Sequence, residues 1–161
     1  MLGVRAYERE LRPLLGQAAA YARALLRNRD DAEDAIQQAA LRAWERIEQY
    51  DEARPFKGWW FAILRNCCFD VMRHRSKSRT DSLDGVDPPD DRESGPLDWE
   101  SLDAGLGRLA PAHQEILHLR YYGALSYADL AEALGIPRGT VMSRLHLARK
   151  ALAAQLHEED L

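Results

Sequence analysis

The chain has 161 residues, 46% of them hydrophobic, and a formal net charge of -4 at pH 7, which allows one ordinary domain or two small ones with hydrophobic cores. No run approaches the ~20 apolar residues of a membrane span, and the first residues lack the pattern of a signal peptide, so we expect no membrane insertion. The two cysteines, Cys67 and Cys68, are adjacent, which excludes a disulfide framework and indicates a reducing, cytoplasmic compartment. Packing within a helix is the simpler role for this pair, and a redox or metal-binding role is the alternative.

Helices are predicted along the first half of the chain. Apolar residues recur at helical spacing from Leu11 to Leu26 and again from Ile36 to Ile47. A third helix, strongly aromatic at its start, is predicted over roughly Phe56 to Arg75. No alternating strand pattern occurs in the sequence, so the predicted fold class is all-α, with two small helical domains.

The third helix combines side chains that suit a nucleic acid. Trp59 and Trp60 lie at its start, Asn66 follows, and a dense basic run ends it at residues 73–79. Aromatic rings beside amide and basic groups can stack bases and hold the phosphates of a single strand. Because adjacent helix positions point about 100° apart, at least one tryptophan is expected in the core. Buried packing is the alternative for Asn66, and a solvated helix end is the alternative for the basic run.

An acidic segment separates the two halves of the chain. Residues 81–103 hold nine acidic residues against a single arginine, together with prolines and glycines, and show almost no helical periodicity. Such a segment cannot bury enough apolar surface to offset its ordering entropy. It predicts a flexible acidic linker at residues 80–104, between domains at residues 1–79 and 105–161. Without this segment and the acidic tail, the rest of the chain carries a net charge of +7, so basic surfaces are hidden by the overall charge.

The last third of the chain has the pattern of a helix-turn-helix. A helix is predicted from Pro111 to Tyr122, ended by Gly123. The next helix begins at a capping box formed by Ser126 and Asp129 and ends at Gly135, and Pro137 opens the last helix. One stripe of that last helix is apolar and is predicted to be buried; it comprises Val141, Leu145, Ala148 and Leu152.

The rest of the last helix is predicted to contact DNA. It carries no carboxylate from Arg138 to Lys150, but it has four positive charges, so it suits the major groove and can neutralise phosphates. A solvated basic face is the alternative. The predicted DNA-binding residues are Arg138, Thr140, Met142, Ser143, Arg144, His146, Leu147 and Lys150.

The chain closely resembles a bacterial sigma factor of the extracytoplasmic-function (ECF) type, a class that has only sigma regions 2 and 4. Three blocks carry the resemblance: Asp31–Ile47, Trp59–Arg75 and Leu109–Leu152. The resemblance covers nearly the whole chain, with the acidic segment between the regions. It implies a non-enzymatic protein that binds core RNA polymerase, directs it to promoter DNA, helps to melt the start site and is controlled by an anti-sigma factor. The sequence departs from the family pattern at Trp60, where an aliphatic residue is common. It also departs at Leu147, where a basic residue is common, which puts one phosphate or base contact in doubt.

The resemblance also implies site residues. The implied core polymerase-binding residues are Asp31, Asp34, Ile36 and Gln37. The loop from Asp51 to Gly58 resembles one that receives a flipped base of the minus-ten element, at the start of the third helix. The predicted minus-ten DNA-binding residues are Trp59, Asn66, Asp70, Arg73 and Arg75, and the last helix is assigned to the minus-thirty-five element. The acidic linker resembles the segment threaded through the polymerase active-site and RNA-exit channel.

The sequence leaves two other function classes as alternatives. The alternative is a helix-turn-helix transcriptional regulator that acts without joining RNA polymerase; its first domain would show strands or an effector pocket, and the sequence predicts neither. An enzyme has little support, because the five histidines have no partners at metal-ligand spacing and no phosphate-binding loop or nucleophile motif is present. We therefore expect no metal, no cofactor and no small-molecule substrate, and place His113 and His118 on helix surfaces.

Overall fold

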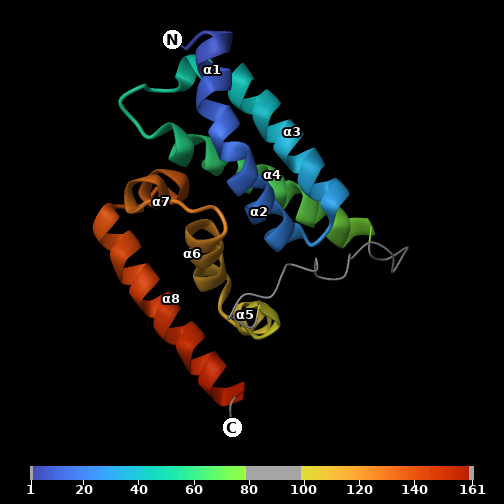
Figure 1. The fold of residues 1–161 in the computed structure, drawn as a ribbon, viewed down its shortest axis with the longest axis vertical. Helices are drawn as coiled ribbons and strands as arrows, with labels where there is room; N and C mark the ends of the chain where they lie inside the picture. Colours follow the sequence, from blue (N-terminus) through green and yellow to red (C-terminus); the bar gives the residue numbers. More distant parts are fainter. Residues whose placement is uncertain (1, 79–98, 160–161) are drawn as a thin grey trace.

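The computed structural model describes residues 2–78 and 99–159 of the chain. Within these two stretches every long element is an α-helix and no strand is present, as the sequence predicts. The helices form two groups that pack against each other, with the N-terminal group above the C-terminal group in Figure 1. None of the described helices combines the length and apolar character needed to cross a membrane.

The N-terminal bundle is built from four α-helices and two short 3-10 turns. In chain order they are α1 (Val4–Leu11), η1 (Arg12–Leu14), α2 (Leu15–Leu26), α3 (Arg29–Glu45), η2 (Ile47–Gln49) and α4 (Phe56–Ser78). Helix α3 begins where the side chain of Asn28 accepts a hydrogen bond of 2.9 Å from the backbone N–H of Asp31. Its buried stripe consists only of alanines, which lets α3 lie close to its neighbours α2 and α4; these are Ala32, Ala35, Ala39 and Ala43.

The C-terminal bundle contains the helix-turn-helix. Its helices are α5 (Trp99–Gly107), α6 (Pro111–Tyr121), α7 (Tyr127–Leu134) and α8 (Arg138–Glu159). The predicted capping box of α7 is confirmed, because Ser126 and Asp129 exchange side-chain to backbone hydrogen bonds of 3.1 and 3.2 Å. Gly135 ends α7 with φ of 65°, in the left-handed region that glycine adopts without strain.

Two sequence predictions about the C-terminal bundle are wrong. Helix α5 begins at Trp99, inside the segment assigned to the linker, and Leu102 of this helix packs against the core. The rest of the predicted linker, residues 79–98, lies outside the described residues. His118 was expected on a helix surface, but it is buried, with Nδ1 2.7 Å from the backbone oxygen of Gln114 and its ring stacked on Tyr122. Burial lowers the pKa of His118, because the apolar surroundings disfavour its charged form.

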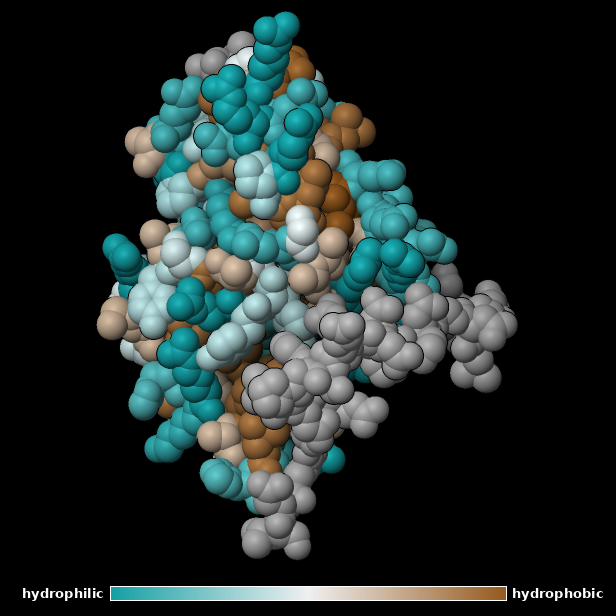
Figure 2. Space-filling view, in the orientation of Figure 1, coloured by the Kyte–Doolittle hydropathy of each residue, from teal (hydrophilic) through white to brown (hydrophobic). Residues whose placement is uncertain are grey.

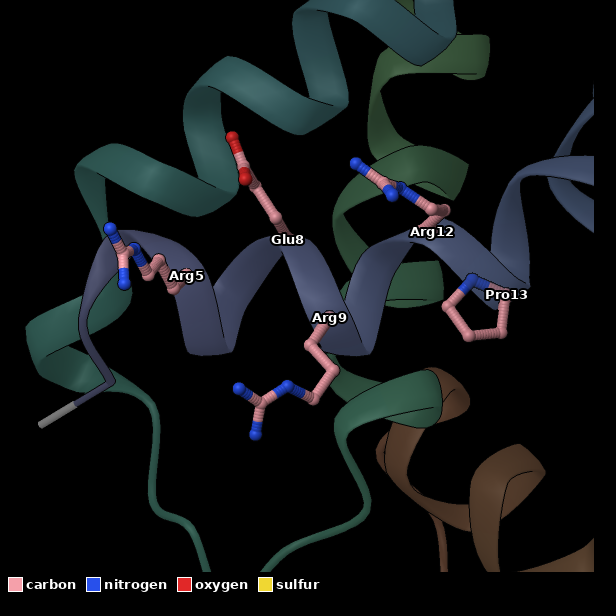
Figure 3. Close-up of a pocket in the computed structure, with 5 residues that line it drawn as sticks. All are labelled: Arg5, Glu8, Arg9, Arg12 and Pro13. Carbon is pink, nitrogen blue, oxygen red and sulfur yellow. The ribbon is translucent and has the colours of Figure 1, made fainter.

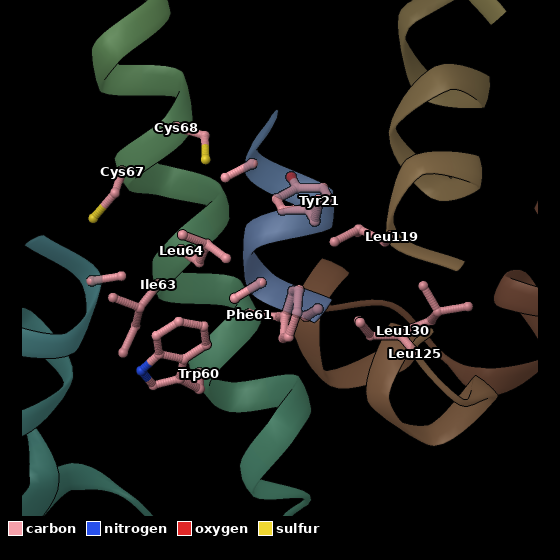
Figure 4. Close-up of a cluster of buried hydrophobic side chains, with 14 of the residues drawn as sticks. Tyr21, Trp60, Phe61, Ile63, Leu64, Cys67, Cys68, Leu119, Leu125 and Leu130 are labelled. Atoms are coloured by element: carbon pink, nitrogen blue, oxygen red, sulfur yellow. The ribbon is translucent and has the colours of Figure 1, made fainter. Parts of the chain in front are cut away.

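The two bundles share one hydrophobic core. Figure 4 shows Tyr21 of α2 and Phe61 of α4 directed toward the leucines of the C-terminal bundle, Leu119, Leu125 and Leu130, and all five side chains are at most 1% exposed. A β-carbon at Gly123 would lie 3.1 Å from the ring of Phe61, so the backbone after α6 approaches α4 closely. We call the contact of α4 and α2 with α6 and α7 the interbundle seam. Removing these side chains from water is the main stabilising contribution at the seam.

Candidate nucleic-acid interface

The two adjacent tryptophans of α4 have different environments. Trp60 is fully buried, whereas Trp59 is partly exposed and packs on Tyr50, with ring centroids 4.8 Å apart, and on Phe56 at 5.8 Å. This places Trp59 in an aromatic cluster next to the exposed loop residues Asp51 to Arg54. The prediction that at least one tryptophan belongs to the core is therefore confirmed, and Trp59 is the one at the surface.

Asn66 and Arg73 are both exposed on α4, so the alternative of Asn66 as a buried packing residue is wrong. Asp70 lies between the side chains of two arginines. It accepts a hydrogen bond of 3.0 Å from Nη1 of Arg42 and also pairs with Arg73. The hydrogen bond from Arg42 and then that from Arg73 lower the pKa of Asp70, so this carboxylate stays ionised and holds Arg73 in place.

Arg75 and Asp31 were assigned to two different surfaces, yet the structure brings them together. Nε of Arg75 donates to Oδ2 of Asp31 at 2.7 Å, and Nη1 donates to the backbone oxygen of Leu26. The arginine thus ties α4 to the corner between α2 and α3. Both side chains are occupied by this contact, which gives each of them a structural role.

The exposed face of α3 carries part of the predicted polymerase-binding set. Asp34 and Gln37 are exposed one helical turn apart, whereas Ile36 is partly buried against the core and lies off this face. The sequence reasoning missed Leu41, which is 59% exposed on the same face. Its spacing of seven residues from Asp34 would have identified it.

Helix α8 presents the predicted recognition surface to solvent. Val141, Leu145 and Ala148 are buried at 1% exposure or less, while Met142 and Leu147 are 57% and 54% exposed. All the other predicted contact residues of α8 are exposed except Thr140, which is partly buried. The helix phase read from the sequence is therefore confirmed. In Figure 2 the visible face of the molecule is mostly hydrophilic, with smaller hydrophobic patches between the polar side chains.

Helix α1 carries a basic surface that the sequence reasoning did not single out. Arg5, Arg9 and Arg12 line an open depression together with Glu8 and Pro13 (Figure 3). Arg5 and Arg9 lie one helical turn apart on α1, and Arg12 follows three residues later at the start of η1. This spacing is the signal that would have found them.

The two cysteines lie in the core and are not part of a metal site in the described residues. Cys67 and Cys68 are both free and buried, and burial raises the pKa of the Cys68 thiol to about 12, so the reactive thiolate is disfavoured. In the part of the chain that the structure describes, no group of three or more His, Cys, Asp or Glu side chains is arranged to hold a metal ion.

Comparisons with known proteins agree with this geometry. Residues 7–79 match the family model of Sigma-70 region 2, and residues 99–152 match that of Sigma-70, region 4, which begins where α5 begins. The chain is 36% identical over 144 residues to the ECF RNA polymerase sigma factor SigL of Mycobacterium tuberculosis, covering 86% of this chain and 81% of SigL. It is 31% identical over 150 residues to the ECF RNA polymerase sigma factor SigW of Bacillus subtilis, covering 83% and 80% of the two chains.

A solved structure has the same fold over almost the full length. The sigma factor RpoE in complex with the anti-sigma factor NepR, from Bartonella quintana, aligns with a TM-score of 0.76 at 29% sequence identity, covering 96% of this chain and 98% of RpoE. Three findings agree. The two sigma-region matches occur in the expected order, two relatives are more than 30% identical over most of their length, and the fold is shared with RpoE. The chain belongs to the family of ECF RNA polymerase sigma factors.

Proposed function

We propose that this protein binds core RNA polymerase and directs it to promoter DNA, with α3 as the polymerase-binding face, α4 reading the minus-ten element and α8 reading the minus-thirty-five element. It is a transcription initiation factor that acts in the cytoplasm and is not an enzyme. The observation that carries the proposal is the presence of two separate exposed surfaces suited to DNA, on α4 and on α8, in a chain of this family.

The surface on α8 suits duplex DNA. Its exposed residues include Arg144 and Lys150 for phosphates and Ser143 for a base edge, whereas the opposite stripe is anchored in the core. A helix held on one side and basic on the other fits the major groove. The exposed side chains of Met142 and Leu147 can contact thymine methyl groups but cannot neutralise phosphates.

The surface on α4 suits a melted strand. A flipped base costs a few kcal/mol of unstacking, which contacts with the protein must offset. Trp59 offers a partly exposed ring beside the loop, Asn66 offers an amide donor and acceptor, and Arg73 offers a positive charge. These are the groups that stacking, base hydrogen bonding and phosphate binding require.

We further propose that an anti-sigma factor controls this protein, because the related RpoE is known in complex with the anti-sigma factor NepR. Binding to core RNA polymerase and recognition of promoter DNA can be tested together. The purified chain should co-elute with core RNA polymerase, and the mixture should transcribe a defined set of promoters. A chain that binds promoter DNA but never co-elutes with core polymerase would favour the regulator that acts alone.

Replacing Asp34 by arginine is expected to weaken core polymerase binding at least tenfold, because it reverses a charge in the middle of the proposed docking face. Since Asp34 is exposed, its replacement should leave stability within about 0.5 kcal/mol of the wild type. Glu33→Arg is the matched control, because this exposed residue points about 100° away on the same helix. Titration of labelled protein with core polymerase measures both affinities. Equal affinities of Asp34→Arg and the wild type would remove Asp34 from the docking face.

Replacing Leu147 by arginine is expected to tighten binding to minus-thirty-five DNA and to steepen the salt dependence by about one unit, as one added phosphate contact does. The exposure of Leu147 means that the substitution should not unfold the protein, and a thermal melt checks this. Ser143→Ala is the comparison, because it should alter base preference and leave the salt slope unchanged. A folded Leu147→Arg variant with the wild-type salt slope would place this residue away from the DNA.

A further inference from the structure

One stripe of α4 is divided between the interbundle seam and solvent. Residues at spacings of four and three positions lie on the same side of a helix. The stripe that contains Gly58 continues through Ala62, Arg65, Phe69 and Arg73. Gly58 lies under α7, where a β-carbon would come 2.7 Å from the backbone oxygen of Asp129. The other end of the stripe is open, because Arg73 is exposed.

Arg65 lies at the border between these two halves. Its Nε donates to Oε1 of Glu115 on α6, and its guanidinium carbon is 4.9 Å from the ring centroid of Phe69. The two charged side chains are 27% and 20% exposed, so the pair is reachable from solvent. Asn66, the exposed amide of the proposed minus-ten surface, is the next residue of the helix.

These features suit a phosphate as well as a carboxylate. The planar guanidinium binds either group, and it stacks on aromatic rings. An arginine held on an aromatic ring beside an exposed amide is an arrangement that single-stranded nucleic acid uses. In the packed arrangement the carboxylate of Glu115 binds the guanidinium of Arg65, the group that a backbone phosphate would bind.

We propose that Arg65 is a nucleic-acid contact of α4 and that Glu115 of the C-terminal bundle competes with the DNA backbone for it. The inference rests on the proposed function. It adds Arg65 to the minus-ten surface and identifies Glu115 as the residue that blocks it. The packed arrangement is then a state in which part of this surface is blocked, and DNA binding on α4 is coupled to release of α6 and α7.

Distance gives an independent reason for this release. A globular chain of this length has a radius of gyration of roughly 15 Å and therefore a diameter of about 40 Å. Two elements centred at minus ten and minus thirty-five are about 25 base pairs, or roughly 85 Å, apart on duplex DNA at 3.4 Å per base pair. The packed arrangement cannot span that distance, so the bundles must separate before both elements are bound.

The polar contacts at the seam hold it closed only weakly, so the shared hydrophobic core is its main barrier to separation. These polar contacts include Arg54 with Glu132 at 3.6 Å, and Lys57 with the backbone oxygen of Ala124 at 2.9 Å. These groups are partly exposed, and ion pairs of this kind contribute little each. DNA shifts the equilibrium toward the open form only by the phosphate contacts that it makes there and does not make in the packed form.

The test uses the full chain and a 20-nucleotide single-stranded DNA of mixed sequence. We expect Glu115→Gln to raise affinity about fivefold, the size of one partly exposed ion pair, and Arg65→Gln to lower it. In the double variant Arg65→Gln/Glu115→Gln the gain should disappear, because the residue that Glu115 masks is absent. A gain that persists in the double variant would show plain charge repulsion and overturn the proposal. Glu45→Gln, the same charge change at an exposed site of α3, should have no effect.

Exchanging the two charged residues distinguishes a loss of the DNA contact from a change in the stability of the seam. Arg65→Glu/Glu115→Arg should keep the chain packed in solution scattering but leave DNA affinity low, because the arginine now lies on α6. DNA affinity equal to wild type in the swapped chain would overturn the role of Arg65. Co-elution with core polymerase is measured on the same samples. If the wild type joins core polymerase but Glu115→Gln does not change DNA affinity, this inference is overturned and the proposed function stands. If the wild type does not join core polymerase, the proposed function itself is overturned.

Discussion

Trp60→Ala should lower the free energy of unfolding by about 3–5 kcal/mol, the range for truncating a large buried aromatic side chain. Trp60 is 0% exposed, and its ring centroid lies 5.7 Å from that of Phe61 at the centre of the core (Figure 4). A small protein has only about 5–15 kcal/mol of stability in total. The variant should therefore be partly unfolded at 37 °C, and urea titration followed by circular dichroism measures the loss.

Trp59→Ala is the matched comparison one residue away. Because Trp59 is partly exposed, its removal should destabilise the chain much less than removal of Trp60. It should instead weaken single-stranded DNA binding by about 1–3 kcal/mol, the value of one stacked base. Equal losses of stability for the two variants would mean that both tryptophans are core residues and that the aromatic cluster with Tyr50 is not a stacking surface.

Gly58→Ala should destabilise the interbundle seam by about 1–3 kcal/mol, the usual cost of overpacking a close contact. A β-carbon at this position would lie 2.7 Å from both the backbone oxygen of Asp129 and the β-carbon of Glu132. Backbone atoms of α7 cannot move aside as the end of a flexible side chain can, so the whole helix must shift. Thermal unfolding and solution scattering should show a lower melting temperature and a larger radius of gyration.

Gly16→Ala is the control for the change of residue type. Gly16 lies near the start of α2 with nothing within 4 Å of the added carbon, so alanine should stabilise the helix by up to about 1 kcal/mol. Opposite changes in stability for the two glycine substitutions would attribute the loss in Gly58→Ala to the crowded contact at the seam and not to the change from glycine to alanine. If Gly58→Ala also stabilised the protein, α7 would not lie on α4 in solution. Gly58→Ala should moreover raise DNA affinity in the same direction as Glu115→Gln, because both open the same seam.

Much of the fold could be predicted because helix formation depends on nearby residues. Apolar spacing located the helices, and the capping box of Ser126 with Asp129 and the glycine at 135 located the ends of α7. The wheel of α8 predicted which residues are buried and which are exposed, because one helix face follows directly from residue spacing. The prediction failed at α5, where acidic and proline-rich surroundings concealed a helix that begins at Trp99.

The sequence by itself determined the helical class, the helix ends, the phase of α8 and the resemblance to ECF sigma factors, since each depends on local spacing or on motifs read along the chain. Only the tertiary structure decided between Trp59 and Trp60, because adjacent aromatic residues look alike until the core is assembled around one of them. It also decided that Arg75 binds Asp31, 44 residues away, and that Arg65 binds Glu115, 50 residues away. Such pairs arise from how the helices pack, and a charged residue on a helix can face solvent, DNA or another helix until its neighbours in space are known.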